Sequence, residues 1–421
     1  AEVIMVDESA AVPADLLKRI LLGWPRVIYA STVHGYEGSG RGFAIRFRSV
    51  LDAETPHWRN TSLTAPIRWS ASDPLEPLTR RMFLLDAQAP PVSDDEVNIA
   101  VERWNPGTAE DNELEEAFGL LVDAHYRTSP GDLRQWMDDP AAVSWRLTRG
   151  GVLVGVLWAT VEGGLDSELA EQVMLGKRRL RGHLLPQSLA THSGFAEAAC
   201  QSLLRIVRIA VSAEVRGEGL GQTLVAAAND YACKQGLDGI GTSFGGNAGL
   251  LSFWQRCGLE PVRLGLKREA SSGEYPLQLL AGVSAQGKAL TDHLRGRLTE
   301  HWLTLVPRNW IDAEPELILR ITCGLPADRP LNENDFRDLH SFAHGYRGFD
   351  LALPVLRRLS LQAGVVNGMA DERSRSLWAR AVLQGWSWPE LQANGECVGR
   401  EAGEAELRSL VGDILQNRPD L

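Results

Sequence analysis

The sequence predicts an α/β protein that ends in an all-helical region. Its first residues alternate strand, helix and strand patterns, which is the order of a parallel α/β sheet. In the middle of the chain, a strand pattern leads into a glycine-rich turn and then a helical pattern. From residue 286 onwards, apolar residues recur only at helical spacing. A chain of 421 residues has room for two or three domains of roughly 150 residues each.

The composition is that of a globular protein with a large core, at 44% hydrophobic and 23% charged residues. No run of about 18 apolar residues occurs and no charged-then-apolar leader opens the chain, so we expect neither a membrane span nor a secretory signal. The histidines, such as His34, His183 and His192, lack ligand spacing, and we predict no metal site held by them. The five cysteines form no CxxC pair, which indicates a reducing, cytoplasmic setting without disulfides.

The N-terminal residues predict a small parallel unit. Residues 3–6 and 26–32 have the pattern of buried strands, and residues 12–24 between them have a helical pattern. A glycine-rich turn at 34–43 and a further strand at 44–48 are expected next. Residues 86–98 are rich in proline and acids, which indicates a boundary. We therefore predict domains at 1–90, 91–285 and 286–421.

The central residues mix helices and strands. We expect a helix at 115–126, a hairpin that turns at Gly150 and Gly151, and a strand at 203–211. A glycine turn with its helix follows that strand. A strand at 239–245, a short helix at 248–258 and a last strand at 259–270 complete the prediction.

The turn after residue 211 reads R-x-x-G-x-G, with Arg216, Gly219 and Gly221 between a strand and a helix. The free N–H groups and the positive dipole end of that helix form a site for anionic phosphate. Glycine is needed where a Cβ would hold the phosphate away from the backbone. The turn is neither a Walker A loop, since no Lys-Ser/Thr follows, nor the dinucleotide G-x-G-x-x-G.

The strand, glycine turn and helix, followed by "GIGTSFG" and "FWQRCGLEPVRLG", resemble the GNAT acetyltransferases, which hold the pyrophosphate of acetyl-CoA in this way. Further blocks resemble the bacterial tRNA(Met) cytidine acetyltransferase family over about 280 residues. These blocks include "VDESAAVPADLL", "STVHGYEGSGRGF", "PIRWSASDPLEPL", "RRLRGHLLPQSLATHSG" and "IAVSAEVRGEGLG".

The resemblance implies a RecA-like NTPase domain joined to a GNAT domain and a helical, tRNA-binding C-terminal region. It implies acetyl-CoA and ATP or GTP with Mg²⁺ as cofactors, and N4-acetylation of the wobble cytidine in the anticodon loop of elongator tRNA(Met). The cofactor residues that it implies are Ile209, Ala210, Val211, Arg216, Gly217, Glu218, Gly219, Leu220, Gly221, Gln222 and Arg256. For the nucleotide it implies Asp7 and Glu8 as a Walker B pair, together with Arg41.

Two departures from the family pattern stand out. The family's Walker A loop lies upstream of the Walker B strand and does not occur in this sequence, so we expect weak nucleotide binding by the chain as given. Gly249 stands where the family has a glutamate near the cofactor, which removes one polar contact.

The net charge of −11 counts against nucleic acid as a partner, but one segment differs from this average. Residues 172–196 contain no carboxylate and hold four clustered cations, Lys177, Arg178, Arg179 and Arg181. We interpret them as an RNA contact, with a solvated surface loop as the alternative.

The sequence does not identify a general base, and we interpret Cys257 as a core residue. Two alternative functions stay open: acetylation of another amine by a GNAT enzyme, and RNA binding without catalysis. We expect Gly219→Glu to block acetyl-CoA binding while RNA binding persists.

Overall fold

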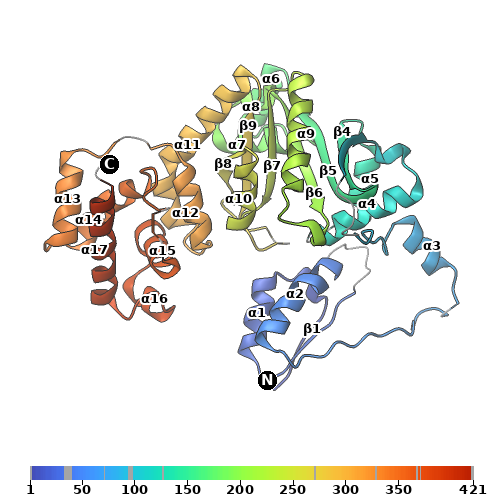
Figure 1. Ribbon diagram of the computed structural model, residues 1–421, viewed down its shortest axis with the longest axis horizontal. Coiled ribbons are helices and arrows are strands. Elements are labelled where there is room, and N and C mark those ends of the chain that lie inside the picture. The colour runs from blue at the N-terminus through green and yellow to red at the C-terminus, as the bar shows by residue number, and fades with distance from the viewer. Residues whose placement is uncertain are drawn as a thin grey trace.

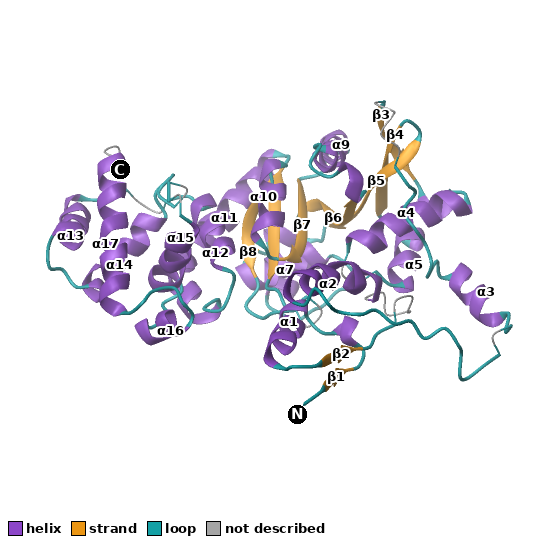
Figure 2. Cartoon of the chain, turned by 60° about the horizontal axis from the view of Figure 1, so that its bottom comes forward, coloured by secondary structure: helices purple, strands orange, loops and turns teal. Residues whose placement is uncertain are grey.

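The computed structural model describes residues 2–32, 40–70, 72–92, 98–125, 128–269, 272–327, 330–366, 368–369 and 371–418. A seven-stranded sheet lies in the middle of the molecule. The last helices form one end of the molecule (Figure 1). The N-terminal strands form a separate small sheet (Figure 2). Within the described residues, no helix combines the length and the apolar character needed to cross a membrane.

The predicted strand, helix and strand at the N-terminus are confirmed. The elements are β1 (Ile4–Val6), α1 (Ala14–Gly23) and β2 (Val27–Tyr29). The two strands pair in parallel, with Ile4 opposite Val27 and Val6 opposite Tyr29. Helix α1 is the crossover connection that two adjacent parallel strands require.

The strand expected at 44–48 is wrong, because residues Gly40–Glu54 form helix α2. The short alternation in "IRFR" suggested a strand, but Phe47, Val50 and Leu51 lie three and four residues apart, as on one face of a helix. Phe47 is buried, and its ring lies edge-on to Tyr29 with centroids 5.1 Å apart. Packing of the helical face against β2 therefore overrides the local alternation.

The large sheet has the order β3-β4-β5-β6-β7-β9-β8. Its strands are β3 (Ile99–Trp104), β4 (Ala142–Arg149), β5 (Val152–Gly163), β6 (Ser202–Val211), β7 (Gly239–Gly245), β8 (Glu260–Leu264) and β9 (Pro276–Gly282). All pairs are antiparallel except β6 with β7. The hairpin at Gly150 and Gly151 is confirmed. The sequence analysis missed β3 and β9, and β9 lies between β7 and β8.

Helices cover both faces of this sheet. The central helices are α4 (Asp111–Ala124), α5 (Pro130–Asp138), α6 (Ser167–Met174), α7 (Leu184–Ser193), α8 (Glu197–Cys200), α9 (Leu220–Lys234) and α10 (Ala248–Arg256). Successive residues of β5 point to opposite faces, so Leu157 packs in the cluster that contains α9, whereas Val156 packs with α4. Likewise, Leu203 of β6 packs with α7 and Leu204 with α9.

The C-terminal region is helical, as predicted. Its helices are α11 (Ala285–Asn309), α12 (Pro315–Gly324), α13 (Glu333–His344), α14 (Phe349–Ser360), α15 (Glu372–Trp378), α16 (Trp388–Ala393) and α17 (Arg400–Asn417). Its core continues into the core around the sheet. The indole of Trp310, for example, donates to the carbonyl of Gly265 at 2.7 Å. The domain limits at 90 and 285 stay predictions.

Candidate active site between two splayed strands

Strands β6 and β7 separate partway along their length. They pair only from Leu203 with Gly239 to Ile206 with Thr242. A bulge follows in β6, because its register against β5 skips Val207. Bulges bend a strand and increase its twist. The second half of β6 therefore leaves β7, and one edge of it is open to a ligand.

The open edge presents the backbone groups of Ile209 and Val211. The N–H of Ser212 donates to Val154 on β5 at 2.8 Å, and the same register pairs Ala210 with Val156. In an antiparallel ladder, residues that bond to the neighbouring strand alternate with residues that point away from it. Ile209 and Val211 are the residues that point away, so their N–H and C=O groups face the gap between the two strands.

The glycine turn follows at the end of this strand. Its ends are anchored by two buried residues, Val215 and Leu220, so the residues between them are held at the surface of the core. Gly217 and Gly219 have φ angles of 92° and 83°, and Gly219 is the N-cap of α9. L-residues with a Cβ rarely adopt such angles. The two glycines thus allow the sharp turn into the helix.

The third glycine of the turn, Gly221, allows close packing against α10. A Cβ on Gly221 would lie 3.0 Å from the ring of Phe253 on α10. By contrast, the space beside Gly217 is open, and a Cβ on Gly219 would meet only the Gln222 side chain at 3.7 Å. That side of the turn is therefore accessible to a ligand.

The amides of the turn have no acceptor in the described part of the chain. Hydrogen bonds within α9 begin with Thr223, whose N–H donates to Gly219. The N–H groups from Gly217 to Gln222 are left to solvent or a ligand. Together with the helix dipole, they form the anion site that the sequence predicts.

One ion pair and one hydrogen bond hold two side chains of the turn in place. Glu218 pairs with Arg149 from the β4–β5 hairpin at 3.1 Å. The guanidinium of Arg216 donates through Nε to the carbonyl of Val211 at 3.1 Å. Arg149 partly neutralises the one carboxylate in the turn, which would otherwise repel an anion.

Helix α10 and its C-cap carry three of the residues considered from sequence. Arg256 is exposed in its last turn, and Gly249 lies in its first turn with room for a side chain. Cys257 packs against the core, and burial raises the pKa of its thiol to about 11. The thiol is therefore protonated at neutral pH, which is consistent with a core residue.

The structure adds a residue that the sequence analysis missed. His125, at the C-cap of α4, donates through Nε2 to the carbonyl of Ile209 at 3.1 Å. It therefore holds the open edge of β6 in place. No local pattern marks this histidine, because it lies far from Ile209 in sequence and only the fold brings the two together.

The basic segment is an exposed loop between α6 and α7. Lys177, Arg178, Arg179 and Arg181 are all exposed and form no ion pair with any described residue. The backbone of the loop is nevertheless fixed, because the Gln187 amide accepts from Leu180 N–H at 2.8 Å and donates to the Leu180 carbonyl at 3.0 Å. The loop therefore presents unpaired cations from a defined backbone.

Asp7 and Glu8 follow β1 at the carboxyl edge of the small parallel sheet, and both are exposed. The carboxyl edge of parallel strands is where α/β proteins bind ligands. The backbone of Arg41 lies in α2, and its side chain lies outside the described residues, as does all of His34. Residues 2–32, 40–70 and the other described ranges contain no cluster of three or more acidic, histidine or cysteine residues suited to a metal ion.

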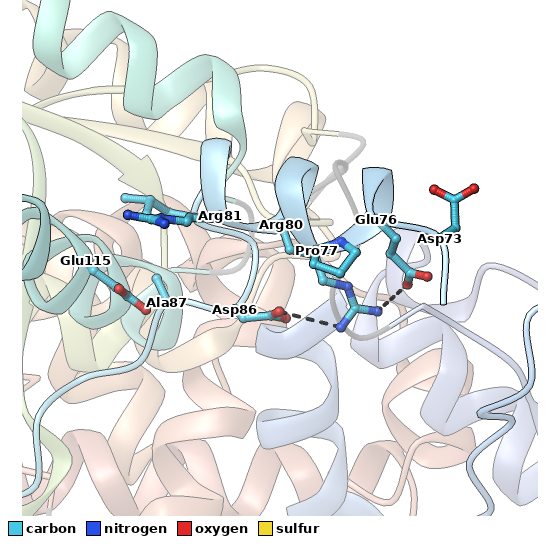
Figure 3. Close-up of a pocket in the computed structure, with 9 residues that line it drawn as sticks. Asp73, Glu76, Pro77, Arg80, Arg81, Asp86, Ala87 and Glu115 are labelled. Carbon is cyan, nitrogen blue, oxygen red and sulfur yellow. Dashed lines mark hydrogen bonds and ion pairs between the residues drawn. The ribbon is translucent and has the colours of Figure 1, made fainter. Parts of the chain in front are cut away.

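One cavity of about 510 Å³ lies away from the glycine turn, between α3 (Leu75–Met82) and α4 (Figure 3). Three of its charged groups bond to each other, since Arg80 pairs with Glu76 at 2.6 Å and with Asp86 at 3.5 Å. The cavity does not include the open edge of β6 or the glycine turn, which together form the candidate active site.

Comparison with known proteins identifies the families that the chain resembles. Residues 1–86 match the family model of the helicase domain of RNA cytidine acetyltransferase NAT10/TcmA, and residues 116–236 match GNAT acetyltransferase 2. The chain is 39% identical to the tRNA(Met) cytidine acetyltransferase TmcA of Nitrosococcus halophilus, over 98% of this chain and 57% of that protein. The proteins of that name from Vibrio cholerae and Salmonella typhimurium are 35% and 36% identical, over 99% and 98% of this chain and 58% and 61% of theirs.

The sheet with its splayed strands, the glycine turn and the family match define a GNAT-type acetyltransferase fold. The chain spans somewhat more than half the length of the curated relatives that it matches. Within the GNAT class, it belongs to the tRNA(Met) cytidine acetyltransferase family, as its sequence predicts.

Proposed function

We propose that this chain transfers the acetyl group of acetyl-CoA to N4 of the wobble cytidine in elongator tRNA(Met). The observation that carries the proposal is the open edge of β6, where the amides of Ile209 and Val211 face the gap and lead to the unpaired amides of the glycine turn. The names of the relatives supply the class of substrate. The wobble position, the N4 atom and the elongator tRNA follow from the family resemblance.

In this proposal the pyrophosphate of the cofactor binds the amides from Gly217 to Gln222, and Arg256 approaches it from α10. The pantetheine arm pairs with β6 as an added strand. The thioester carbonyl then accepts from the N–H of Ile209, which stabilises negative charge as the tetrahedral adduct forms. His125 supports this step as a positioning residue, because it holds the Ile209 carbonyl.

The cytidine amine is neutral at pH 7, so attack needs no prior deprotonation. It is a weak nucleophile because its lone pair is delocalised into the ring, and the rate therefore depends on the alignment of amine and thioester. The wobble base has to leave the anticodon stack, which costs least in a single-stranded loop. The unpaired cations at 177–181 and the C-terminal helical region are the proposed tRNA contacts.

For the nucleotide, we propose Asp7 and Glu8 as a Walker B pair and Arg41 as a phosphate contact. Their exposed carboxylates at the edge of a parallel sheet fit this role, in which Asp7 would hold Mg²⁺ through water and Glu8 would orient the hydrolytic water. ATP or GTP hydrolysis would supply the energy to remodel the anticodon loop. Cytoplasmic localisation is part of the same proposal, since tRNA is processed there.

Incubation of the purified chain with elongator tRNA(Met) transcript and labelled acetyl-CoA tests the proposal. We expect label in N4-acetylcytidine at the wobble position after digestion to nucleosides, with no label in a transcript that carries uridine there. Acetylation of proteins or polyamines without acetylation of the tRNA would contradict the proposed substrate. Binding of tRNA without transfer, at saturating acetyl-CoA and with ATP and Mg²⁺ present, would contradict the proposed activity.

A further inference from the structure

A row of polar side chains crosses three strands of the large sheet on the face that α7 covers. The row consists of Ser243 on β7, Gln278 on β9 and Arg263 on β8. Ser243 is paired with Gln278, and Gln278 with Arg263, in the two antiparallel registers. Directly opposed residues project from the same face of a sheet. The hydroxyl of Ser188 on α7 donates to Gln278 Oε1 at 3.1 Å, which identifies that face.

This polar row begins where the strands separate. Ser243 directly follows Thr242, the last residue at which β7 pairs with β6, and it is exposed. Because neighbouring strands lie about 4.8 Å apart, Arg263 on β8 is roughly 10 Å from β7. A polymeric substrate whose reacting group enters the gap can therefore bring a neighbouring unit to the partly exposed guanidinium of Arg263, which lies beyond the buried Gln278.

Arg263 has no carboxylate partner among the described residues, although it is partly buried. Its Nη1 lies 3.3 Å from Ser188 Oγ and 3.4 Å from Gln278 Oε1, which are both neutral. Burial lowers the pKa of Arg263. By contrast, the buried Arg205 is paired with an acid, Glu162, at 2.7 Å. The remaining N–H donors of Arg263 are thus available to an anion.

The surroundings of Arg263 are positive. Burial and the nearby charges of Arg263 and Arg179 lower the pKa of His192 at the end of α7. The charges of both arginines therefore act on this exposed histidine, which lies at the end of α7 that follows Ser188. A guanidinium offers a planar set of donors that matches the oxygens of a phosphate.

We infer that Arg263 binds a phosphodiester group of the polynucleotide substrate, next to the nucleotide whose base enters the gap between β6 and β7. The inference rests on the proposed function and adds a specific substrate contact that is separate from the basic loop. Ser188 and Gln278 orient the guanidinium through Nη1, and its outer edge faces the RNA. Arg179 approaches the same strand of RNA from the loop.

The test compares Arg263→Gln with Arg134→Gln and the unchanged chain. Arg134 is an exposed arginine on α5 whose ion pair among the described residues is with Asp138 at 3.4 Å, so its replacement removes the same charge elsewhere on the same sheet domain. Affinity for elongator tRNA(Met) is measured by filter binding over a range of salt concentrations. Thermal melting and acetyl-CoA calorimetry show whether each variant is folded.

We expect Arg263→Gln to weaken tRNA binding roughly tenfold at low salt and to reduce the slope of log K against log salt by about 0.7, the value for one contact with a single strand. Acetyl-CoA affinity should stay the same, Arg263→Lys should recover part of the loss, and Arg134→Gln should match the unchanged chain. Equal tRNA affinity and slope in Arg263→Gln and Arg134→Gln would overturn the inference and leave the proposed function in place. Failure of the unchanged chain to bind tRNA would overturn both.

A free phosphate ion offers Arg263 the same chemistry as a phosphodiester of RNA, so a second experiment distinguishes the two ligands. Inorganic phosphate is titrated into the unchanged chain, and binding is followed by the NMR signals of the His192 ring. We expect only weak binding. Saturation by inorganic phosphate at concentrations that also release tRNA would show a small-anion site and overturn the assignment to RNA.

Discussion

Gly219→Glu is the most direct test of the cofactor site. Gly219 has a φ angle of 83° at the N-cap of α9, and the space beside it is open apart from the Gln222 side chain. Gly236, after the C-terminus of the same helix, has a φ angle of 66° and no atom within 4 Å of the Cβ position. The two positions are therefore matched in backbone conformation and in free space. They differ in that Gly219 borders the amides proposed to bind pyrophosphate, and in that it lies at the N-terminal rather than the C-terminal end of the helix.

The structure sets the size of the expected effects. A residue other than glycine in this backbone region costs about 1–2 kcal/mol, and Gly236→Glu should lose the same amount of stability. At position 219 the new Cβ also holds the pyrophosphate away from the amides. Loss of two charge-assisted hydrogen bonds at about 1.5–3 kcal/mol each weakens acetyl-CoA binding by more than about a hundredfold. The glutamate adds repulsion between like charges to that loss.

Calorimetry with acetyl-CoA and thermal melting of the two variants measure these quantities. We expect similar melting temperatures, a complete loss of measurable acetyl-CoA binding in Gly219→Glu, and unchanged binding in Gly236→Glu. Filter binding should show that Gly219→Glu still binds tRNA. Acetyl-CoA affinity in Gly219→Glu equal to that of the unchanged chain would refute the reasoning, because the turn would then not contact the pyrophosphate.

Three further predictions concern single side chains. Arg149→Ala should weaken acetyl-CoA binding about fivefold in calorimetry, since Glu218 loses its 3.1 Å partner beside the anion site. Adding Glu218→Gln to the Arg149→Ala chain should restore the affinity, and no recovery would contradict this account. Alkylation of Cys257 by iodoacetamide at pH 8 should be slow, because burial raises the pKa of its thiol to about 11. The rate should rise only as the pH approaches that value, and rapid labelling at pH 8 would contradict the burial of the thiol. Glu162→Gln should cost about 3–5 kcal/mol in denaturant unfolding, because it leaves the buried guanidinium of Arg205 without the negative charge that lies 2.7 Å away. A loss below about 1 kcal/mol would show that the pair is dispensable.

Some secondary structure was predictable because its pattern is local. The helical spacing before β2 and after β9 lies within single segments, and the two glycines at the hairpin between β4 and β5 mark a turn in any context. The same reasoning failed at α2, where five residues of alternation were outweighed by packing of Phe47 against Tyr29. It also missed β3 and β9, although β9 carries the apolar run "PLQLLAG", because that run lies between the predicted last strand and the helical region.

By itself, the sequence determined the glycine turn, because R-x-x-G-x-G between an apolar run and a helical pattern marks a sharp turn from a strand into a helix. It also determined the cluster of cations at 177–181, since an absence of acids over a long segment is visible in composition alone. Only the tertiary structure decided what surrounds these features. The bulge at Val207 opens the edge of β6, and the fold brings His125 to Ile209 and aligns Ser243, Gln278 and Arg263 in one row. Strand register and contacts between distant segments depend on how the whole core packs, and no local pattern in the chain encodes them.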